Sequence, residues 1–195
     1  GVPDRLSLTT WTVEAWIYPS NATQTGSLVQ RVTEDGCTNF DLRLDNNLPS
    51  VSFTTRSGQR VVAGGSVPVS AQTWTHLAGI WSPTSNALSI YVNGVAFQSQ
   101  QSPLRPATGW GKTTLGNGLS GNLDDVRIWN VVRSGGEVYT NYNKYAEWVF
   151  GNSRQPATFE GIDFFEGERA FASQVLPLGG FALGRQSEAN QHGIS

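Results

Sequence analysis

The sequence predicts an all-β protein, a two-sheet antiparallel β-sandwich with one short helix after the last core strand. Short segments of alternating apolar and polar residues recur along the chain, and Gly, Asn, Asp and Pro separate them. Asn93-Gly94 joins two apolar runs and is a strong signal for a two-residue hairpin. Near residue 130 an alternating run leads directly into a helix start. These three observations favour a sandwich with many turns over a helical or α/β protein.

The first strand is expected at residues 10–18, where every second side chain is apolar. Its apolar face is formed by Trp11, Val13, Ala15 and Ile17. Glu14, Trp16 and Tyr18 lie on the opposite face. This pattern indicates a strand buried on one side and partly covered on the other, and Pro19 ends it.

Further alternating segments follow between turn signals. The expected strands are at residues 27–32, 39–44, 51–55, 74–81, 87–92, 95–97 and 112–115. The polar stretch 98–106 is expected to cross from one part of the sandwich to another. Short strands at this spacing indicate a meander that contributes to both sheets.

The run 121–130 is the strand around which the rest is organised. Val126 and Ile128 fall on one face, and Arg127 and Trp129 fall on the other. Ser134 follows at once, three residues before Glu137. This spacing predicts a capping box, in which each side chain bonds the backbone of the other residue, so a short helix is expected from here.

Three ordered motifs carry a resemblance to a known family. They are Trp11-Thr12-Val13-Glu14-Ala15-Trp16-Ile17-Tyr18-Pro19, Ile90-Tyr91-Val92-Asn93-Gly94, and Leu123-Asp124-Asp125-Val126-Arg127-Ile128-Trp129-Asn130 with Arg133-Ser134 and Glu137. Together they span roughly residues 5–145, and they resemble the laminin-G-like, concanavalin A-like jelly rolls. The resemblance implies a jelly-roll sandwich that is usually extracellular, often binds glycans or proteins, and often carries calcium.

Length and composition set the expected organisation. The chain of 195 residues suits one domain, expected at residues 1–148, with a C-terminal extension at 149–195 that packs on the sandwich or on a neighbouring subunit. The net charge of −2 and the absence of a Lys/Arg cluster argue against a nucleic-acid partner. No apolar run approaches the ~20 residues of a membrane helix, so membrane insertion is not expected.

The expected location is outside the cell or on its surface. Charged residues are only 14% of the chain, and Gly, Ser, Thr, Asn and Gln are abundant, as in many secreted sandwiches. The chain begins at Gly1 and contains no Met, so a preceding segment is expected to have been removed.

Enzyme chemistry is not expected. Hydrolysis of a glycosidic bond needs two carboxylates about 5–9.5 Å apart. In the acidic stretch 160–168, Glu160 and Glu166 would share a strand face about 20 Å apart. His76 and His192 are the only histidines and have no metal-ligand spacing. The sequence therefore predicts a non-catalytic protein.

One structural calcium ion is the expected cofactor, because a hard cation takes oxygen ligands from loops. Glu34 and Asp35 lie in the loop where the similar pentraxins carry one pair of ligands. Asp124 and Asp125 lie near the loop that would supply the others. The alternative for Asp124 and Asp125 is a hydrogen bond at the strand end or an ion pair with Arg127.

Six of the seven tryptophans fall into two groups, and the seventh, Trp148, could form an exposed aromatic patch for a partner with Tyr142 and Tyr145. Those in strand patterns are expected to fill the core: Trp11, Trp16, Trp74, Trp81 and Trp129. Trp110 lies between Gly109 and Gly111, which have no side chains to bury it, so it is the candidate stacking platform for a sugar. Asn117 and Asn122, at the turn before the last core strand, complete the candidate ligand-binding residues.

The leading hypothesis from the sequence is a secreted, non-catalytic module that binds a glycan or glycoprotein. The alternative is an extracellular structural protein that forms homo-oligomers or polymers. In that case the terminal segments would add strands to the sheets of neighbouring subunits.

Overall fold

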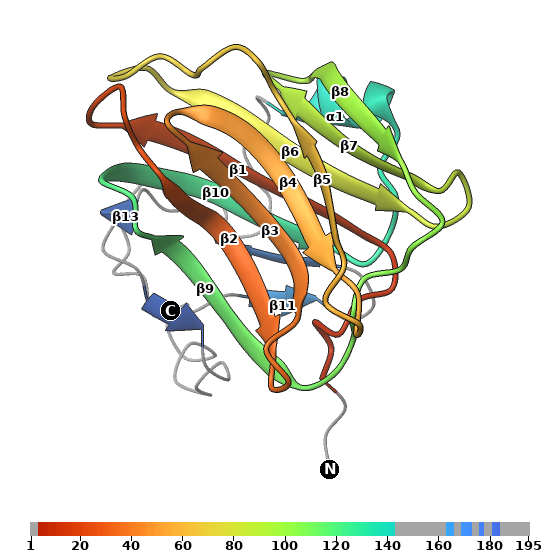
Figure 1. Ribbon diagram of the computed structural model, residues 1–195. Coiled ribbons are helices and arrows are strands. Elements are labelled where there is room, and N and C mark those ends of the chain that lie inside the picture. The colour runs from red at the N-terminus through yellow and green to blue at the C-terminus, as the bar shows by residue number, and fades with distance from the viewer. Residues whose placement is uncertain (1–3, 143–162, 166–168, 173–175, 178–180, 184–195) are drawn as a thin grey trace.

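The computed structural model describes residues 4–142, 163–165, 169–172, 176–177 and 181–183. Two antiparallel sheets lie face to face (Figure 1), which confirms the predicted jelly-roll sandwich. The first ten strands are β1 (Trp11–Pro19), β2 (Gly26–Thr33), β3 (Thr38–Asp45), β4 (Leu48–Thr54), β5 (Arg60–Gly64), β6 (Thr75–Ser82), β7 (Ala87–Val92), β8 (Val95–Gln101), β9 (Gly111–Asn117) and β10 (Gly121–Trp129).

Strands alternate between the sheets in a jelly-roll order. The first sheet, called sheet A here, has the order β11-β12-β10-β1-β6-β7-β8, and β13 also pairs with β10. The second, sheet B, has the order β14-β9-β2-β3-β4-β5. The first and last core strands, β1 and β10, are therefore neighbours at the centre of sheet A.

The four short C-terminal strands that the structure describes extend the two sheets of the same chain. They are β11 (Asp163–Phe165), β12 (Arg169–Ala172), β13 (Leu176–Pro177) and β14 (Phe181–Leu183). β12 pairs antiparallel with β10, and β14 pairs antiparallel with β9. No helix in the described part of the chain is long and apolar enough to cross a membrane.

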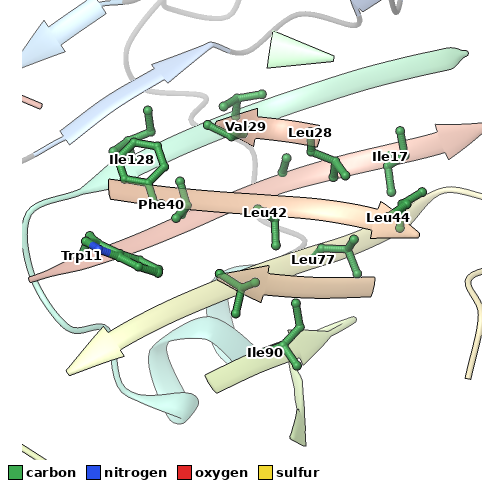
Figure 2. Close-up of a cluster of buried hydrophobic side chains, with 14 of the residues drawn as sticks. Trp11, Ile17, Leu28, Val29, Phe40, Leu42, Leu44, Leu77, Ile90 and Ile128 are labelled. Carbon is green, nitrogen blue, oxygen red and sulfur yellow. The ribbon is translucent and has the colours of Figure 1, made fainter. Parts of the chain in front are cut away.

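One hydrophobic cluster fills the space between the sheets (Figure 2). The predicted apolar face of β1 is completely buried in it, from Trp11 to Ile17. Trp11 meets Phe40 edge-on, with ring centroids 5.9 Å apart, and Phe53 meets Trp81 at 4.8 Å. Burial of these large rings is the main source of stability in a two-sheet sandwich.

The predicted helix forms at Gly135–Asn141 and is labelled α1. Ser134 is its N-cap, and both bonds of the predicted capping box with Glu137 are present. Val138 is completely buried against Ala78 and Ile80 of β6. Helix α1 therefore covers the outer face of sheet A, the face that points away from the core.

The predicted Asn93-Gly94 hairpin is confirmed, because both residues have the positive φ that this turn requires, 49° and 77°. Trp11 and Trp81 lie in the core as predicted, with no exposed area. The core assignment of Trp16 and Trp129 is wrong, because both are half-buried on the outer face of sheet A. The core assignment of Trp74 is also wrong: it is 37% exposed and lies just before β6 begins at Thr75. Its ring packs on Tyr18 instead, at 5.6 Å.

Candidate functional site

Trp110 immediately precedes β9 and lies near the N-terminal segment, because the Gly109 N–H donates to Oγ of Ser7 at 2.8 Å. Its side chain is 51% exposed, the most exposed tryptophan of the described chain. The turn between β2 and β3 is its neighbour, because the Glu34 N–H donates to the Trp110 carbonyl at 2.7 Å. The structure thus brings together three predicted residues, Trp110, Glu34 and Asp35.

The two glycines beside Trp110 are required by the backbone. Gly109 has a φ of 151°, which L side chains rarely adopt. A Cβ at Gly111 would lie 2.2 Å from the carbonyl oxygen of Val32, so no side chain fits there. The loop therefore presents one large aromatic side chain with no side chains on either flank.

A buried arginine fixes this loop from below. Arg31 of β2 is 2% exposed and donates to the carbonyl of Gly109 at 3.2 Å and that of Gly111 at 3.4 Å. The guanidinium also pairs with Asp4. Burial lowers the pKa of Arg31, and the Asp4 carboxylate beside it raises it. Because both carbonyls flanking Trp110 are held by one buried group, the position of its backbone is well defined.

Arg56 and Asp35 supply polar groups beside Trp110. Arg56, in the turn between β4 and β5, donates to the Thr108 carbonyl at 2.7 Å. Its other terminal nitrogen lies 3.5 Å from Oδ2 of Asp35, and both side chains are largely exposed. A hydrogen bond from Thr33 lowers the pKa of Asp35, and the charge of Arg56 lowers it further. We call Glu34, Asp35, Arg56, Thr108 and Trp110 the loop-end site.

The other predicted residues lie elsewhere. In the β2–β9 pair, Thr33 is opposite Gly111 and Ser27 is opposite Asn117. Six residues of strand, about 20 Å, therefore separate Trp110 from Asn117. Asn117 is exposed and Asn122 is half-buried at the far end of the sandwich. They do not contribute to the loop-end site.

Asp124 and Asp125 belong to β10, on the outer face of sheet A. Asp125 has a φ of 46° and forms a β-bulge, and Arg127 bonds both of its carboxylate oxygens. Burial raises the pKa of Asp125, and the Arg127 charge opposes this effect. Burial also raises the pKa of Asp124, whose carboxylate accepts from the Asp125 N–H at 2.8 Å. Here the structure has the ion pair that the sequence offered as the alternative to calcium.

The four carboxylates predicted to bind calcium do not surround one ion. Glu34 and Asp35 are in the turn at the end of β2, whereas Asp124 and Asp125 lie in β10 of the other sheet. Within the described residues, no three His, Cys, Asp or Glu side chains come together in a way that could hold a metal ion. Calcium binding by either pair alone stays a prediction.

A second group of charges, also on the outer face of sheet A, is closed to ligands. Glu14 has no exposed area and pairs with Arg133, and its other oxygen lies 3.3 Å from Nε2 of His76. Arg133 also donates to the Glu137 carbonyl at 2.9 Å and lies over the Trp129 ring at 4.7 Å. These contacts tie α1 to the sheet.

Sequence reasoning missed two residues of the loop end, Arg31 and Arg56. Arg31 had a detectable signal, since it occupies an apolar-face position in the alternation of β2, two residues after the buried Val29. A charged residue at such a position needs a buried partner. Arg56 had no signal, because its contact with Thr108 spans 52 residues and depends on how the turns meet.

The family is shown by a match over residues 2–139 to the model of the concanavalin A-like lectin/glucanase superfamily. The chain belongs to this family. A search of curated proteins gave no match.

Solved structures share the fold at low sequence identity. A putative carbohydrate-binding protein from Bacteroides ovatus is similar with a TM-score of 0.61 and 16% identity, over 93% of this chain and 56% of that one. A heptameric SAP-like pentraxin from Limulus polyphemus gives 0.58 and 15%, over 93% and 86%. The CBM40 module of a Ruminococcus gnavus sialidase, bound to α2,3-sialyllactose, gives 0.57 and 12%, over 69% and 83%.

Proposed function

We propose that this protein is a non-catalytic carbohydrate-binding module that acts outside the cell or on its surface, with the loop-end site as its glycan site. One sugar ring stacks on Trp110, and its hydroxyl groups bond Arg56 and Asp35. The fold supports this proposal because structures of the same architecture include carbohydrate-binding proteins. The loop-end site would therefore recognise the glycan by stacking on the Trp110 ring and by a few hydrogen bonds.

The observation that carries the proposal is the half-exposed Trp110 on a firmly held loop. A ligand that covers the exposed ring removes a large, flat apolar surface from water, and this burial favours binding. The apolar face of a pyranose is such a cover, and the polar groups at the rim then fix its orientation. The buried Arg31 holds the loop in place before the ligand arrives, so little ordering entropy is lost on binding.

The electrostatics of the loop end support binding without catalysis. A glycosidase needs one carboxyl group that stays protonated near neutral pH, which requires a raised pKa. At the loop end the pKa of Asp35 is lowered, first by Thr33 and then by Arg56. An ionised Asp35 accepts hydrogen bonds from sugar hydroxyls but does not donate a proton to a leaving group.

The test is a glycan array probed with wild-type protein and with Trp110→Ala. We expect binding to a subset of glycans by the wild type and a loss of about two- to tenfold in affinity for the variant, since an aromatic contact contributes about 0.5–1.5 kcal/mol beyond the area it buries. Trp74→Ala is the matched control, because Trp74 is also a partly exposed tryptophan and lies outside the loop end.

Each outcome of the array has a meaning. Equal loss in both variants, or full binding by Trp110→Ala, would overturn the loop-end site. Absence of binding to every glycan by the wild type would overturn the carbohydrate-binding function. Running the array with calcium and again with a chelator shows whether a calcium ion orders the Glu34-Asp35 turn.

Self-assembly is the second candidate, and β8 favours it. All seven residues of this edge strand are exposed, and the strand contains no charged residue and no proline to discourage pairing. Two copies paired antiparallel would place Gln98 opposite Gln98. We expect Gln98→Lys to set two like charges face to face and to return any oligomer to monomer in sedimentation velocity. A wild type that is monomeric throughout would remove this candidate.

A further inference from the structure

The outer face of sheet B, which points away from the core, carries a row of side chains that runs across five strands. The strand registers place Thr114, Gln30, Asp41, Ser52 and Val62 side by side, on β9, β2, β3, β4 and β5. These residues alternate with core residues such as Phe40 and Leu42, so they face outward. The centre of the row is the carboxylate of Asp41.

The carboxylate of Asp41 is buried, and one of its oxygens lacks a hydrogen-bond donor within the described chain. Its side chain is 4% exposed, and among the described residues Oδ1 has no hydrogen-bond partner. Oδ2 lies 3.6 Å from Nη1 of Arg43, which is too long for a hydrogen bond. Burial raises the pKa of Asp41, and Ser27, Arg43, Arg60 and Gln30 lower it only in part. A buried carboxylate oxygen without a donor is costly, so a donor from outside the protein would be favoured here.

Two arginines lie beside this carboxylate with donors left over. Arg43 is two residues along β3, and its side chain is 27% exposed. Arg60 reaches from β5 over β4, where it donates to Ser52 at 3.2 Å. The charge of Arg60 also acts on Asp41, and within the described part of the chain neither arginine has a further hydrogen bond or ion pair through its side chain. Each guanidinium has five N–H donors, so most of them remain for a ligand.

We infer that Gln30, Asp41, Arg43, Ser52 and Arg60, called the sheet B patch, form a binding site for an acidic sugar. The carboxylate of the sugar pairs with Arg43 and Arg60, and a hydroxyl of the same ring donates to Oδ1 of Asp41. The patch needs an acceptor for its two arginines and a donor for its aspartate within a few ångströms. A carboxylated pyranose offers both groups on one rigid ring.

Arg43 controls access to the patch. Its side chain is long and partly exposed, and its 3.6 Å contact with Asp41 is weak in water-accessible surroundings. An incoming carboxylate competes with Asp41 for this guanidinium and draws it outward. Asp41 then loses its loose ion pair and gains the sugar hydroxyl, so its charge stays compensated.

The sheet B patch is separate from the loop-end site and does not depend on it. It contains no aromatic side chain to stack on, so it selects by charge and hydrogen bonding. Arg43 and Arg60 give the patch two positive charges against the one carboxylate of Asp41, and this local excess attracts an anionic ligand.

The test is a titration of ¹⁵N-labelled full-length protein with galacturonic acid, followed by the amide and arginine Nε resonances. Galactose is the matched neutral probe. We expect galacturonate to shift resonances of β3, β4 and β5 at millimolar concentration, and galactose to bind about tenfold more weakly or not at all. Arg43→Gln and Asp41→Asn should each weaken galacturonate binding by about tenfold.

Two control variants keep this test independent of the loop end. Lys112→Gln removes an exposed positive charge from β9 without touching the patch, and Trp110→Ala removes the loop-end ring. Both should bind galacturonate like the wild type. Equal binding of the two sugars, undiminished binding by Arg43→Gln and Asp41→Asn, loss with Trp110→Ala, or no binding at all would each overturn the patch. The loop-end site is judged separately, by the glycan array.

Discussion

The outer face of each sheet carries a buried carboxylate between two core residues, but the pKa values of the two carboxylates are shifted in opposite directions. On sheet A, Glu14 of β1 is flanked by residues whose side chains enter the core. On sheet B, Asp41 of β3 is flanked in the same way by Phe40 and Leu42. Both carboxylates are buried, yet the pKa of Asp41 is raised and that of Glu14 is lowered. The difference lies in their partners.

The charge of Glu14 is compensated from two sides, although its Oε2, like Oδ1 of Asp41, has no hydrogen-bond partner among the described residues. Burial raises its pKa, but the His76 ring nitrogen that faces it and the charges of Arg133 and Arg127 outweigh this effect. Arg133 follows β10 and reaches from Glu14 to the backbone of α1. Helix α1 thus covers a paired charge. No helix of the described chain covers Asp41, and its partners, Ser27, Gln30, Arg43 and Arg60, do not outweigh the effect of burial on its pKa. A buried carboxylate therefore stabilises the fold where a buried arginine of the same chain pairs with it. Where its counter-charges are loose, it can accept a hydrogen bond from a ligand.

Glu14→Gln is the variant for which we expect the largest loss of stability. The variant leaves Arg133, which is 6% exposed, without its buried counter-charge, while the exposed Glu137 carboxylate still acts on it. Removal of one partner of a buried ion pair costs about 3–5 kcal/mol, so we expect a loss of this size in the free energy of unfolding, measured with urea. Helix α1 should loosen at the same time, and hydrogen exchange at Val138 should become faster.

Glu137→Gln is the control for this variant. It removes a carboxylate from the same region, but Glu137 is exposed and a glutamine can also close a capping box. We expect a loss of about 1 kcal/mol or less, because the variant removes a negative charge at the helix N-terminus and beside Arg133. If Glu14→Gln were equally mild, the Glu14–Arg133 pair would have no structural weight and the contrast between the two faces would fail.

Most of the fold and part of the loop-end site could be predicted from the sequence. The apolar faces of β1 and β10 and the capping box were readable because each depends on neighbours within a few residues. β5 was missed, since only Val61 and Ala63 of its five residues are buried and so short an alternation is hard to detect. Trp74 was misplaced because it borders a strand without belonging to it.

Some functional residues could likewise be predicted from their sequence neighbours, whereas others depend on contacts between distant parts of the chain. Trp110 could be singled out from its two glycines alone, and its exposure follows from them. The pairing of Arg133 with Glu14 links residues 119 positions apart, and no local pattern encodes it. Asp41 and Arg43 alternate with Leu42 and Leu44, so their common outward face was readable. That Asp41 would be buried there depends on the side chains of three neighbouring strands.

The smallest effect that we expect is on the pH dependence of folding stability, to which the two carboxylates contribute with opposite signs. The folded-state pKa of Glu14 is below its ordinary value, so its contribution to stability is present above that value and is lost as the pH falls through the folded-state pKa. The folded-state pKa of Asp41 is raised, so the folded state keeps the proton longer. Stability therefore declines as the pH rises from the ordinary pKa of an aspartate through the raised one.

Urea unfolding of the wild type, Glu14→Gln and Asp41→Asn at a series of pH values checks these signs. Asp41→Asn removes a buried charge and keeps the side-chain size, so the variant should be slightly more stable than the wild type near neutral pH. This gain should vanish in acid, where Asp41 of the wild type is protonated. The deficit of Glu14→Gln should also shrink in acid, so both variants approach the wild type from opposite sides. A destabilised Asp41→Asn at neutral pH would mean that ionised Asp41 already has a strong partner within the chain, and the sheet B patch would lose its vacant acceptor.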